Sequence, residues 1–333
     1  MAYLTHSKKL SHTDLINKIL AGDVVSLSRA ITLVESKSNI DREIANKILK
    51  ECLLKKATSI RIGITGVPGV GKSTFIESLG TYLTTLDKKI AVLAVDPSSS
   101  VSKGSILGDK TRMQNLVKDK NVFIRPSPAG NHLGGVSNKT RESIILCEAA
   151  GYDIILIETV GVGQSEISVY EMVDYFLLLK LAGAGDELQG IKRGIIEMAD
   201  SIIINKADGD NIRATEIAKS EFQMALNLYP LKSSKWKPKV STCSSIDSSG
   251  VKEIWGEIDD YFKLTKTNGY FSSNRKNQKK HWLMQTLNHR VQTTFFSNEK
   301  IRNELKNQVK LIENNQTTVL AATEIIINTG KVV

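Results

Sequence analysis

The chain has 333 residues, of which 41% are hydrophobic, and this is enough for one large domain with appendages or for two modest ones. No apolar run approaches the ~20 residues of a membrane-spanning helix, and the N-terminal residues lack the apolar region of a signal peptide. We therefore expect a soluble, cytoplasmic protein with no membrane partner. The three cysteines lie far apart and no Cys/His cluster accompanies them, which argues against a disulfide scaffold and a structural zinc site.

The formal net charge is +10, and most of the excess lies between Lys263 and Lys310, where eleven basic residues stand against two acidic ones. A basic patch of this kind can bind nucleic acid. No nucleic-acid-binding motif accompanies it, however, and the run "SSNRKNQKK" is also typical of a solvated connector. We therefore do not expect a nucleic-acid partner.

Three parts follow one another along the chain. Residues 1–56 are predicted to form an N-terminal helical extension, because "SHTD" is an S-x-x-D helix start and the later apolar residues recur at helical spacing. Residues 57–265 alternate apolar strands with helical stretches, which predicts an α/β domain with a mostly parallel sheet covered on both faces. Residues 266–333 are predicted to be a linker, residues 266–280, followed by a C-terminal helical arm. The expected strands are "IRIGIT", "IAVLAVD", "VFIRP", "DIILIE", "YFLLLKL" and "SIIINKAD".

"GVPGVGKST" matches G-x-x-x-x-G-K-[ST] and lies between a predicted strand and a predicted helix. In such a loop the glycines let backbone N–H groups surround phosphate oxygens, and the helix N-terminus adds partial positive charge. Lys72 is expected to reach the β- and γ-phosphates and the Ser73 hydroxyl to bind Mg²⁺. The motif predicts a nucleoside triphosphate site without identifying the base. Its residues are Gly66, Val67, Pro68, Gly69, Val70, Gly71, Lys72, Ser73 and Thr74.

Two acidic residues further along the chain are candidates for the Mg²⁺ site. Asp96 ends the strand "IAVLAVD", and the carboxyl ends of neighbouring strands lie beside the phosphate loop in such sheets. We expect Asp96 to bind Mg²⁺ through water or to orient the attacking water. Asp109, in "GSILGDKTRM", is a second candidate metal ligand, although an ordinary loop acid is an equally good interpretation.

The stretch "ETVGVGQSE" begins at Glu158, at the end of "DIILIE". Most GTPases have Asp-x-x-Gly at this point, and Glu-x-x-Gly takes its place here. The longer Glu158 side chain can reach the Mg²⁺ shell directly or through a water. The Gly161 N–H is expected to sense the γ-phosphate and to relax after hydrolysis, and Gln164 belongs to the same predicted switch. The alternative is a strand followed by a flexible glycine turn.

A second glycine-rich loop, "LAGAGDELQGIK", follows the next predicted strand. Charged side chains on a flexible glycine frame suggest a segment that changes with the bound nucleotide and signals this to a partner. An ordinary polar loop is an equally good interpretation. The candidate switch or partner residues here are Asp186, Glu187, Gln189 and Lys192.

"NKAD" ends the late strand "SIIINK" and points to guanine. The Asp208 carboxylate can accept both the N1–H and the exocyclic N2–H of guanine, whereas adenine has no such donor pair. Asn205 and Lys206 are expected to brace the loop and stack on the base. In "STCSS", the small residues Cys243, Ser244 and Ser245 suit backbone contact with the guanine carbonyl.

Together these segments resemble one family, the GTPases that accompany adenosylcobalamin-dependent methylmalonyl-CoA mutase. Relatives of this family have also been labelled arginine/ornithine transport-system kinases. The resemblance covers residues 24–260 strongly and the C-terminal arm weakly. The resembling segments are "AITLVES", "GVPGVGKSTFIESLG", "AVDPSSS", "GSILGDKTRM", "IRPSP", "LGGVSNKTRE", "CEAAGYD", "ETVGVGQSE", "GAGDELQGIK" and "NKAD".

The resemblance implies a P-loop G domain of the dimerising signal-recognition/MinD-like class, with GTP or GDP and Mg²⁺ as ligands and a C-terminal arm that forms a homodimer. It also implies a chaperone role: gating cobalamin loading into the mutase and protecting or rescuing that enzyme, with low GTPase activity that the mutase raises. Two departures leave the partner open: "AGNH", residues 129–132, replaces small hydroxyl residues, and Ala182 replaces a usual proline.

Two other functions stay open. A metal-insertion GTPase of the same broad class would need Cys or His ligands near the switches, and the scattered positions of these residues count against it. A small-molecule or protein kinase of a transport system would need an acceptor pocket, and the guanine signature "NKAD" counts against it.

Overall fold

The computed structural model describes residues 11–36, 38–56, 58–95, 113–126, 133–159, 165–183 and 193–330. The chain forms two compact units, Met1–Lys276 and Asn277–Val333. Among the described residues, no helix combines the length and apolar character that a bilayer crossing requires.

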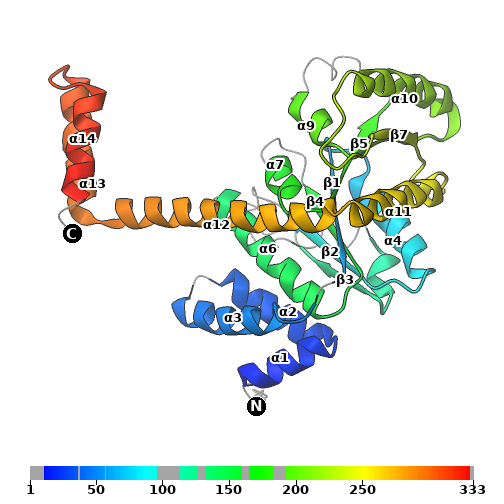
Figure 1. The fold of residues 1–333 in the computed structure, drawn as a ribbon, viewed down its shortest axis with the longest axis horizontal. Helices are drawn as coiled ribbons and strands as arrows, with labels where there is room; N and C mark the ends of the chain where they lie inside the picture. Colours follow the sequence, from blue (N-terminus) through cyan, green and yellow to red (C-terminus); the bar gives the residue numbers. More distant parts are fainter. Residues whose placement is uncertain are drawn as a thin grey trace, which may run out of the picture. The chain divides into compact units, whose positions relative to one another are not determined.

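The first unit is built around a parallel sheet whose described strands follow the order β3-β2-β4-β1-β5-β6-β7 (Figure 1). Every neighbouring pair is parallel. The six strands predicted from the sequence are confirmed, and β7 is an additional strand beside β6. The strands are β1 (Ile60–Gly66), β2 (Ile90–Val95), β3 (Val122–Arg125), β4 (Ile154–Thr159), β5 (Tyr175–Leu181), β6 (Ser201–Asn205) and β7 (Lys239–Thr242).

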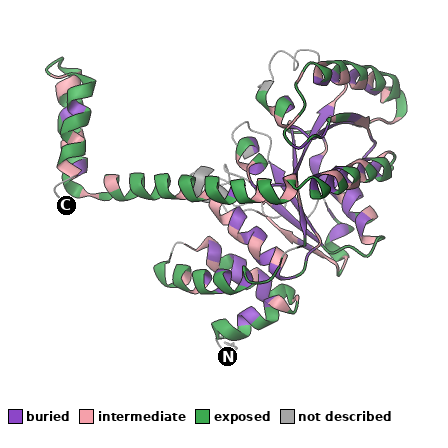
Figure 2. Cartoon of the chain, viewed as in Figure 1, coloured by how far each residue is buried: buried purple, intermediate pink, exposed green. Residues whose placement is uncertain are grey.

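Helices cover both faces of this sheet, so β4 and β6 are buried along their whole length (Figure 2). Ile155 of β4 packs into a core cluster with residues of α6, and its neighbour Leu156 packs into another with residues of α4 and α11. A strand with core on both faces needs a continuous apolar run, which explains the sequence pattern. The covering helices are α4 (Lys72–Thr84), α6 (Leu133–Ala149), α7 (Ser165–Tyr170), α9 (Arg193–Met198), α10 (Ile212–Asn227) and α11 (Val251–Thr267), with 3₁₀ turns η1 (Leu116–Lys118) and η2 (Gly209–Asn211).

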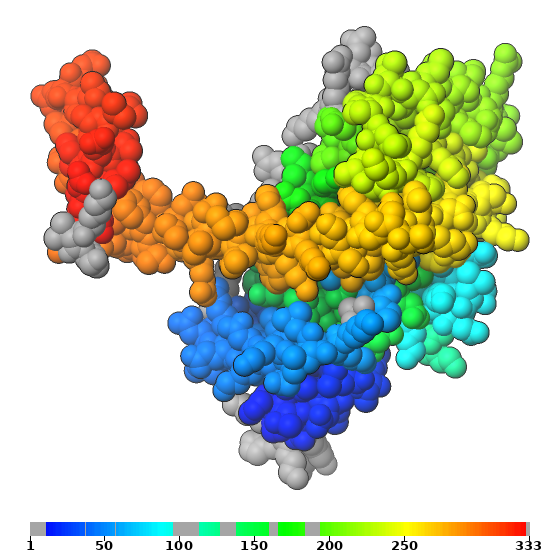
Figure 3. Space-filling view, viewed as in Figure 1, coloured from blue at the N-terminus to red at the C-terminus, as the bar shows by residue number. Residues whose placement is uncertain are grey.

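The predicted N-terminal helices are α1 (His12–Leu20), α2 (Val24–Glu35) and α3 (Asn39–Cys52). Ser11 is the N-cap of α1, as "SHTD" predicts: its hydroxyl accepts a hydrogen bond from the Asp14 N–H at 3.1 Å. The three helices form the blue lobe in Figure 3. Their apolar faces share one core cluster with α6, so this lobe is packed onto the G domain through that helix.

The strand order changes direction across the sheet at the neighbouring strands β1 and β4. The crossover after β1 leads to β2 on one side, and the crossover after β4 leads to β5 on the other. In open parallel sheets, ligands bind outside the carboxyl ends of the strands at such a point. The phosphate loop follows β1 and Glu158 lies near the end of β4, so both predicted site elements occupy this position.

A buried ion network lies at the amino ends of the strands. The Arg275 guanidinium donates to Asp174 Oδ1 at 2.7 Å and to Glu148 Oε1 at 3.3 Å, and Arg61 Nε donates to Glu148 Oε1 at 2.9 Å. The Arg275 side chain is only 14% exposed. Arg275 therefore departs from the expectation that "SSNRKNQKK" is a solvated connector, because two buried acids hold it in place.

Only two residues separate α11 from α12 (Tyr270–Ser297), so most of the expected linker 266–280 is helical. In the second unit, α13 (Glu299–Glu313) and α14 (Val319–Gly330) pack against each other, and Ile301 is buried in their contact region. The apolar side chains of Leu283, Leu287 and Val291 on α12 are half exposed or more. The boundaries between the N-terminal extension, the G domain and the arm, placed after residues 56 and 265, stay a prediction.

Candidate nucleotide site

The phosphate loop joins β1 to α4 in a conformation that requires glycine at two tight positions. Gly66 and Gly71 have φ of 153° and 98°. A Cβ at Gly66 would lie 2.6 Å from the Leu179 carbonyl oxygen, and one at Gly71 would lie 2.6 Å from Asn205 Nδ2. The loop backbone can therefore pass close to its neighbours only because these residues lack a side chain.

Lys72 and Ser73 begin α4, directly after the loop. Lys72 Nζ donates to the carbonyl oxygens of Gly66 and Val67, at 2.8 and 3.2 Å, so the ammonium lies over the start of the loop. Ser73 Oγ donates to Glu158 Oε1 at 3.1 Å. The structure thus brings together two of the predicted metal residues, which are 85 residues apart in the sequence.

Glu158 is held beside the loop by the sheet. It pairs with Ile64 of β1 on one side and with Ala94 of β2 on the other, and it is only 7% exposed. The next residue, Thr159, donates from Oγ1 to Thr65 Oγ1 at 2.9 Å. Sequence reasoning did not single out these two threonines, since β1 and β4 become neighbours only in the folded sheet.

Asn205, at the end of β6, joins the phosphate loop to the second predicted base loop. Its Nδ2 donates to the Val70 carbonyl at 2.8 Å. Its Oδ1 accepts from Ser245 Oγ at 2.7 Å and from Cys243 Sγ at 3.3 Å. Burial raises the pKa of the Cys243 thiol to about 12, so this cysteine is a neutral hydrogen-bond donor here.

Asp208 lies next to the same loop. Its Oδ2 accepts from Ser244 Oγ at 2.8 Å, and the Ala207 N–H donates to the Cys243 carbonyl at 2.9 Å. Lys206 adopts a left-handed backbone with φ of 61° and is exposed, which turns the chain between Asn205 and Asp208. The "NKAD" and "STCSS" segments therefore form one hydrogen-bonded unit at the carboxyl ends of β6 and β7.

Several predicted residues lie outside the described residues, and the role of each stays a prediction. Ala182 is described, in the turn after β5. Within the part of the chain that the structure describes, no three His, Cys, Asp or Glu side chains form a cluster that could hold a metal ion by themselves. The residues outside the description are Asp96, Asp109, Gly161, Gln164, Asp186, Glu187, Gln189, Lys192 and residues 129–132.

Comparison with known proteins gives one family match and several similar relatives. The family model for the methylmalonyl-CoA mutase-associated GTPase MeaB matches residues 27–300. A probable GTPase of Mycobacterium tuberculosis is 45% identical over 324 residues, covering 95% of this chain and 96% of the relative. The mouse protein named methylmalonic aciduria type A homolog, mitochondrial, is 44% identical over 301 residues, covering 87% of this chain and 72% of the relative.

A solved structure shares the whole fold. The crystal structure titled LAO/AO transport system kinase has a TM-score of 0.79 and 34% sequence identity, and the match covers 98% of this chain and 99% of that one. The α/β fold with a parallel sheet, predicted from the sequence, is therefore confirmed both by the strand order and by this likeness.

Proposed function

This chain belongs to the family of methylmalonyl-CoA mutase-associated GTPases. We propose that it is a GTP-hydrolysing chaperone for an adenosylcobalamin-dependent acyl-CoA mutase, and methylmalonyl-CoA mutase is the first candidate client. In this role it gates cofactor loading and protects or reactivates the mutase. GTPase activity and the binding of GTP or GDP follow from the family and from the P-loop fold. The client, the metal and the residue roles below are the proposal.

Guanine recognition is assigned to Asp208, with Asn205, Lys206 and the loop 243–245 as its support. The hydrogen bond from Ser244 uses one carboxylate oxygen of Asp208 and limits rotation of the group. A carboxylate held in this way can accept the paired N1–H and N2–H donors of guanine. Adenine would leave it facing a ring nitrogen acceptor, so the carboxylate would form neither hydrogen bond.

The phosphate chain and Mg²⁺ are assigned to the loop, to Lys72 and Ser73, and to Glu158. The Ser73 hydroxyl and the Glu158 carboxylate are oxygen donors in contact with each other, which is the ligand chemistry that Mg²⁺ prefers. Mg²⁺ in nucleotide sites takes only one or two protein groups besides phosphate and water, so two such residues are sufficient. When bound, the ion neutralises charge on the β- and γ-phosphates.

Hydrolysis at this site needs no covalent enzyme intermediate. Lys72 and the loop N–H groups stabilise negative charge on the phosphoryl oxygens, and we assign Asp96 to orienting the attacking water. Gly161 and Gln164 are assigned to the nucleotide-sensing switch, with Asp109 as a further metal candidate. The loop with Asp186, Glu187, Gln189 and Lys192 is assigned to the partner.

The C-terminal arm, residues 266–333, is assigned to homodimerisation. The exposed row Leu283, Leu287 and Val291 on α12 supports this assignment, because residues at four-residue spacing form one helix face that a second copy can cover. Residues 1–56 and 57–265 then form the N-terminal extension and the G domain of each subunit.

The observation that carries the proposal is the family match over residues 27–300 together with one hydrogen-bonded site that joins phosphate, metal and base elements. The test is turnover of GTP and of ATP, with and without a purified cobalamin-dependent mutase. We expect slow GTP turnover that rises when the mutase is added. GTP turnover that no mutase changes contradicts the chaperone role, and a preference for ATP contradicts the base assignment and favours the kinase alternative.

A further inference from the structure

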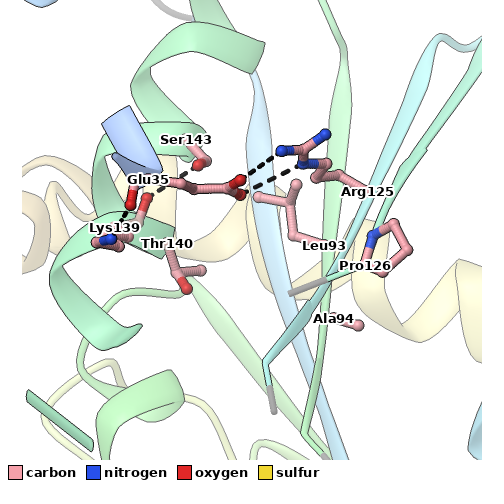
Figure 4. A pocket seen from close by; sticks show the side chains of 8 residues that line it. All are labelled: Glu35, Leu93, Ala94, Arg125, Pro126, Lys139, Thr140 and Ser143. Carbon is pink, nitrogen blue, oxygen red and sulfur yellow. Dashed lines mark hydrogen bonds and ion pairs between the residues drawn. The ribbon is translucent and has the colours of Figure 1, made fainter. Parts of the chain in front are cut away.

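Glu35, the last residue of α2, contacts two elements of the G domain at once. Its carboxylate forms an ion pair with Arg125 at the end of β3, where Arg125 Nε donates to one oxygen at 3.3 Å and Nη2 donates to the other. Its backbone carbonyl accepts a hydrogen bond from Lys139 Nζ of α6. Figure 4 shows these three residues around a small pocket whose wall includes Leu93 and Ala94 of β2.

The N-terminal lobe holds Glu35 rigidly. Helix α2 buries Leu27 and Ile31 completely in the core that it shares with α6. Arg125 Nη2 also donates to Thr32 Oγ1 at 3.3 Å, one turn before Glu35. The guanidinium therefore spans two residues on one face of α2, and a planar fork held at two points has a fixed orientation.

The sheet connects this contact to the nucleotide site. Arg125 pairs with Leu93 of β2, and the next residue of that strand, Ala94, pairs with Glu158 of β4. Glu158 in turn accepts the hydrogen bond from Ser73. Only one strand, β2, thus separates the ion pair from the carboxylate beside the phosphate loop. Each step is a pairing between neighbouring strands, a bond along the chain or a hydrogen bond.

We propose that Glu35 is a positioning residue for GTP hydrolysis: by holding Arg125 and Lys139 it fixes the end of β3 and the middle of α6, and through β2 the position of Glu158 beside Ser73. The N-terminal helices are then part of the hydrolytic machinery. This inference rests on the proposed role of Glu158 at Mg²⁺, although the GTPase activity on which it is measured does not depend on that role.

The test is Glu35→Gln in the full chain, which keeps the side-chain shape but removes the charge that orients Arg125. We expect kcat for GTP to fall about tenfold, as coupling through a packed network allows. The KM for GTP should stay close to that of the unchanged protein, because the phosphate and base loops are untouched. The Mg²⁺ concentration that gives half-maximal turnover should rise.

Glu148→Gln is the matched control. It is the same substitution in an ion pair of similar burial, Glu148–Arg61, at the amino ends of the strands. It should lower stability and leave kcat and the Mg²⁺ requirement unchanged. Equal losses of kcat in both variants would overturn the proposal in favour of general destabilisation, and so would an unchanged kcat and Mg²⁺ requirement in Glu35→Gln.

A milder variant covers the case in which Glu35→Gln fails to fold. Thr32→Ala removes the second Arg125 contact and one hydrogen bond within α2, from Thr32 Oγ1 to the Ser28 carbonyl. We expect a smaller fall of kcat in the same direction with the same rise in the Mg²⁺ requirement. If Thr32→Ala changes neither, the proposal is wrong. If the unchanged chain has no GTP turnover at all, the proposed function itself is wrong. That outcome can be told apart from the two variant results, because it is seen before any substitution is made.

Discussion

The side-chain amide of Asn205 donates to the Val70 carbonyl at 2.8 Å and so joins two loops that are 135 residues apart in the sequence. Its oxygen accepts from Ser245 and from Cys243. Both ends of the amide are therefore used within the protein. In the proposed nucleotide site, Asn205 fixes the distance between the loop assigned to the phosphates and the loop assigned to the base.

Asn205→Ala should weaken the binding of both GTP and GDP and should also lower the stability of the fold. Asn205 is 1% exposed, and its removal leaves the Val70 carbonyl and the Ser245 hydroxyl without their partner, which costs about 1–3 kcal/mol for each buried group. Urea unfolding and calorimetric titration with GDP measure the two effects. Asn205→Asp, which keeps the shape but has no donor for Val70, should show a similar loss of GDP affinity. An unchanged affinity in both variants would refute the bracing role.

Asp208→Asn should weaken GTP binding by about 100-fold, because two hydrogen bonds to a charged acceptor are lost. Xanthine nucleotides provide the control, since xanthine carries a carbonyl where guanine has its exocyclic amine. The new amide can donate to that carbonyl, so the variant should prefer xanthosine triphosphate. Competition binding of the two nucleotides measures the preference, and a variant that keeps its affinity for GTP would show that the base lies elsewhere.

Gly71→Ala should abolish nucleotide binding, whereas Gly69→Ala should only reduce it. Both glycines have positive φ, 98° and 81°, so each substitution costs about 1–3 kcal/mol in backbone strain. A Cβ at Gly71 also meets Asn205 Nδ2 at 2.6 Å, while a Cβ at Gly69 meets nothing within 4 Å. Fluorescent GDP titration separates the two cases. Equal losses would mean that backbone strain alone, and not the contact with Asn205, limits this loop.

Ser73→Ala and Glu158→Gln should both raise the Mg²⁺ concentration needed for turnover. Ser73→Ala removes the hydroxyl that we propose as a metal ligand, and Glu158→Gln removes the negative charge that we propose attracts the cation. We expect each to lower kcat at fixed Mg²⁺, with partial recovery as Mg²⁺ rises. GTP turnover titrated with Mg²⁺ measures this. An unaltered Mg²⁺ dependence in Glu158→Gln would remove Glu158 from the metal shell.

Acid should destabilise the protein through Glu148. Burial raises the pKa of its carboxyl, but Arg61 and Arg275 lower it more, so the pKa lies below its usual value. Because the pKa is lower in the folded state, the stabilisation is complete above the unfolded value of about 4.3 and is lost as pH falls through the folded value. Unfolding free energy should therefore decline less steeply at acidic pH in Glu148→Gln than in the unchanged protein. Identical slopes would contradict the charge network.

The sequence alone determined the elements that carry local chemistry. The G-x-x-x-x-G-K-S pattern, the apolar runs and "NKAD" predict a phosphate loop, six parallel strands and a base loop, because each of these depends on residues close together in the chain. Covered strands must be apolar throughout and tight loops must contain glycine, so these features leave a mark on the sequence itself.

Tertiary structure alone decided which distant side chains meet. Ser73 contacts Glu158 because the strand order places β4 beside β1. Asn205 reaches Val70 because only β5 separates β6 from β1 in the sheet. Glu35 binds Arg125 because α2 packs against α6. Arg275 has the sequence surroundings of a solvated lysine-rich run, and yet its side chain is only 14% exposed. Such pairings are set by sheet register and helix packing, which depend on the sum of many apolar contacts along the chain and leave no pattern at the paired residues themselves.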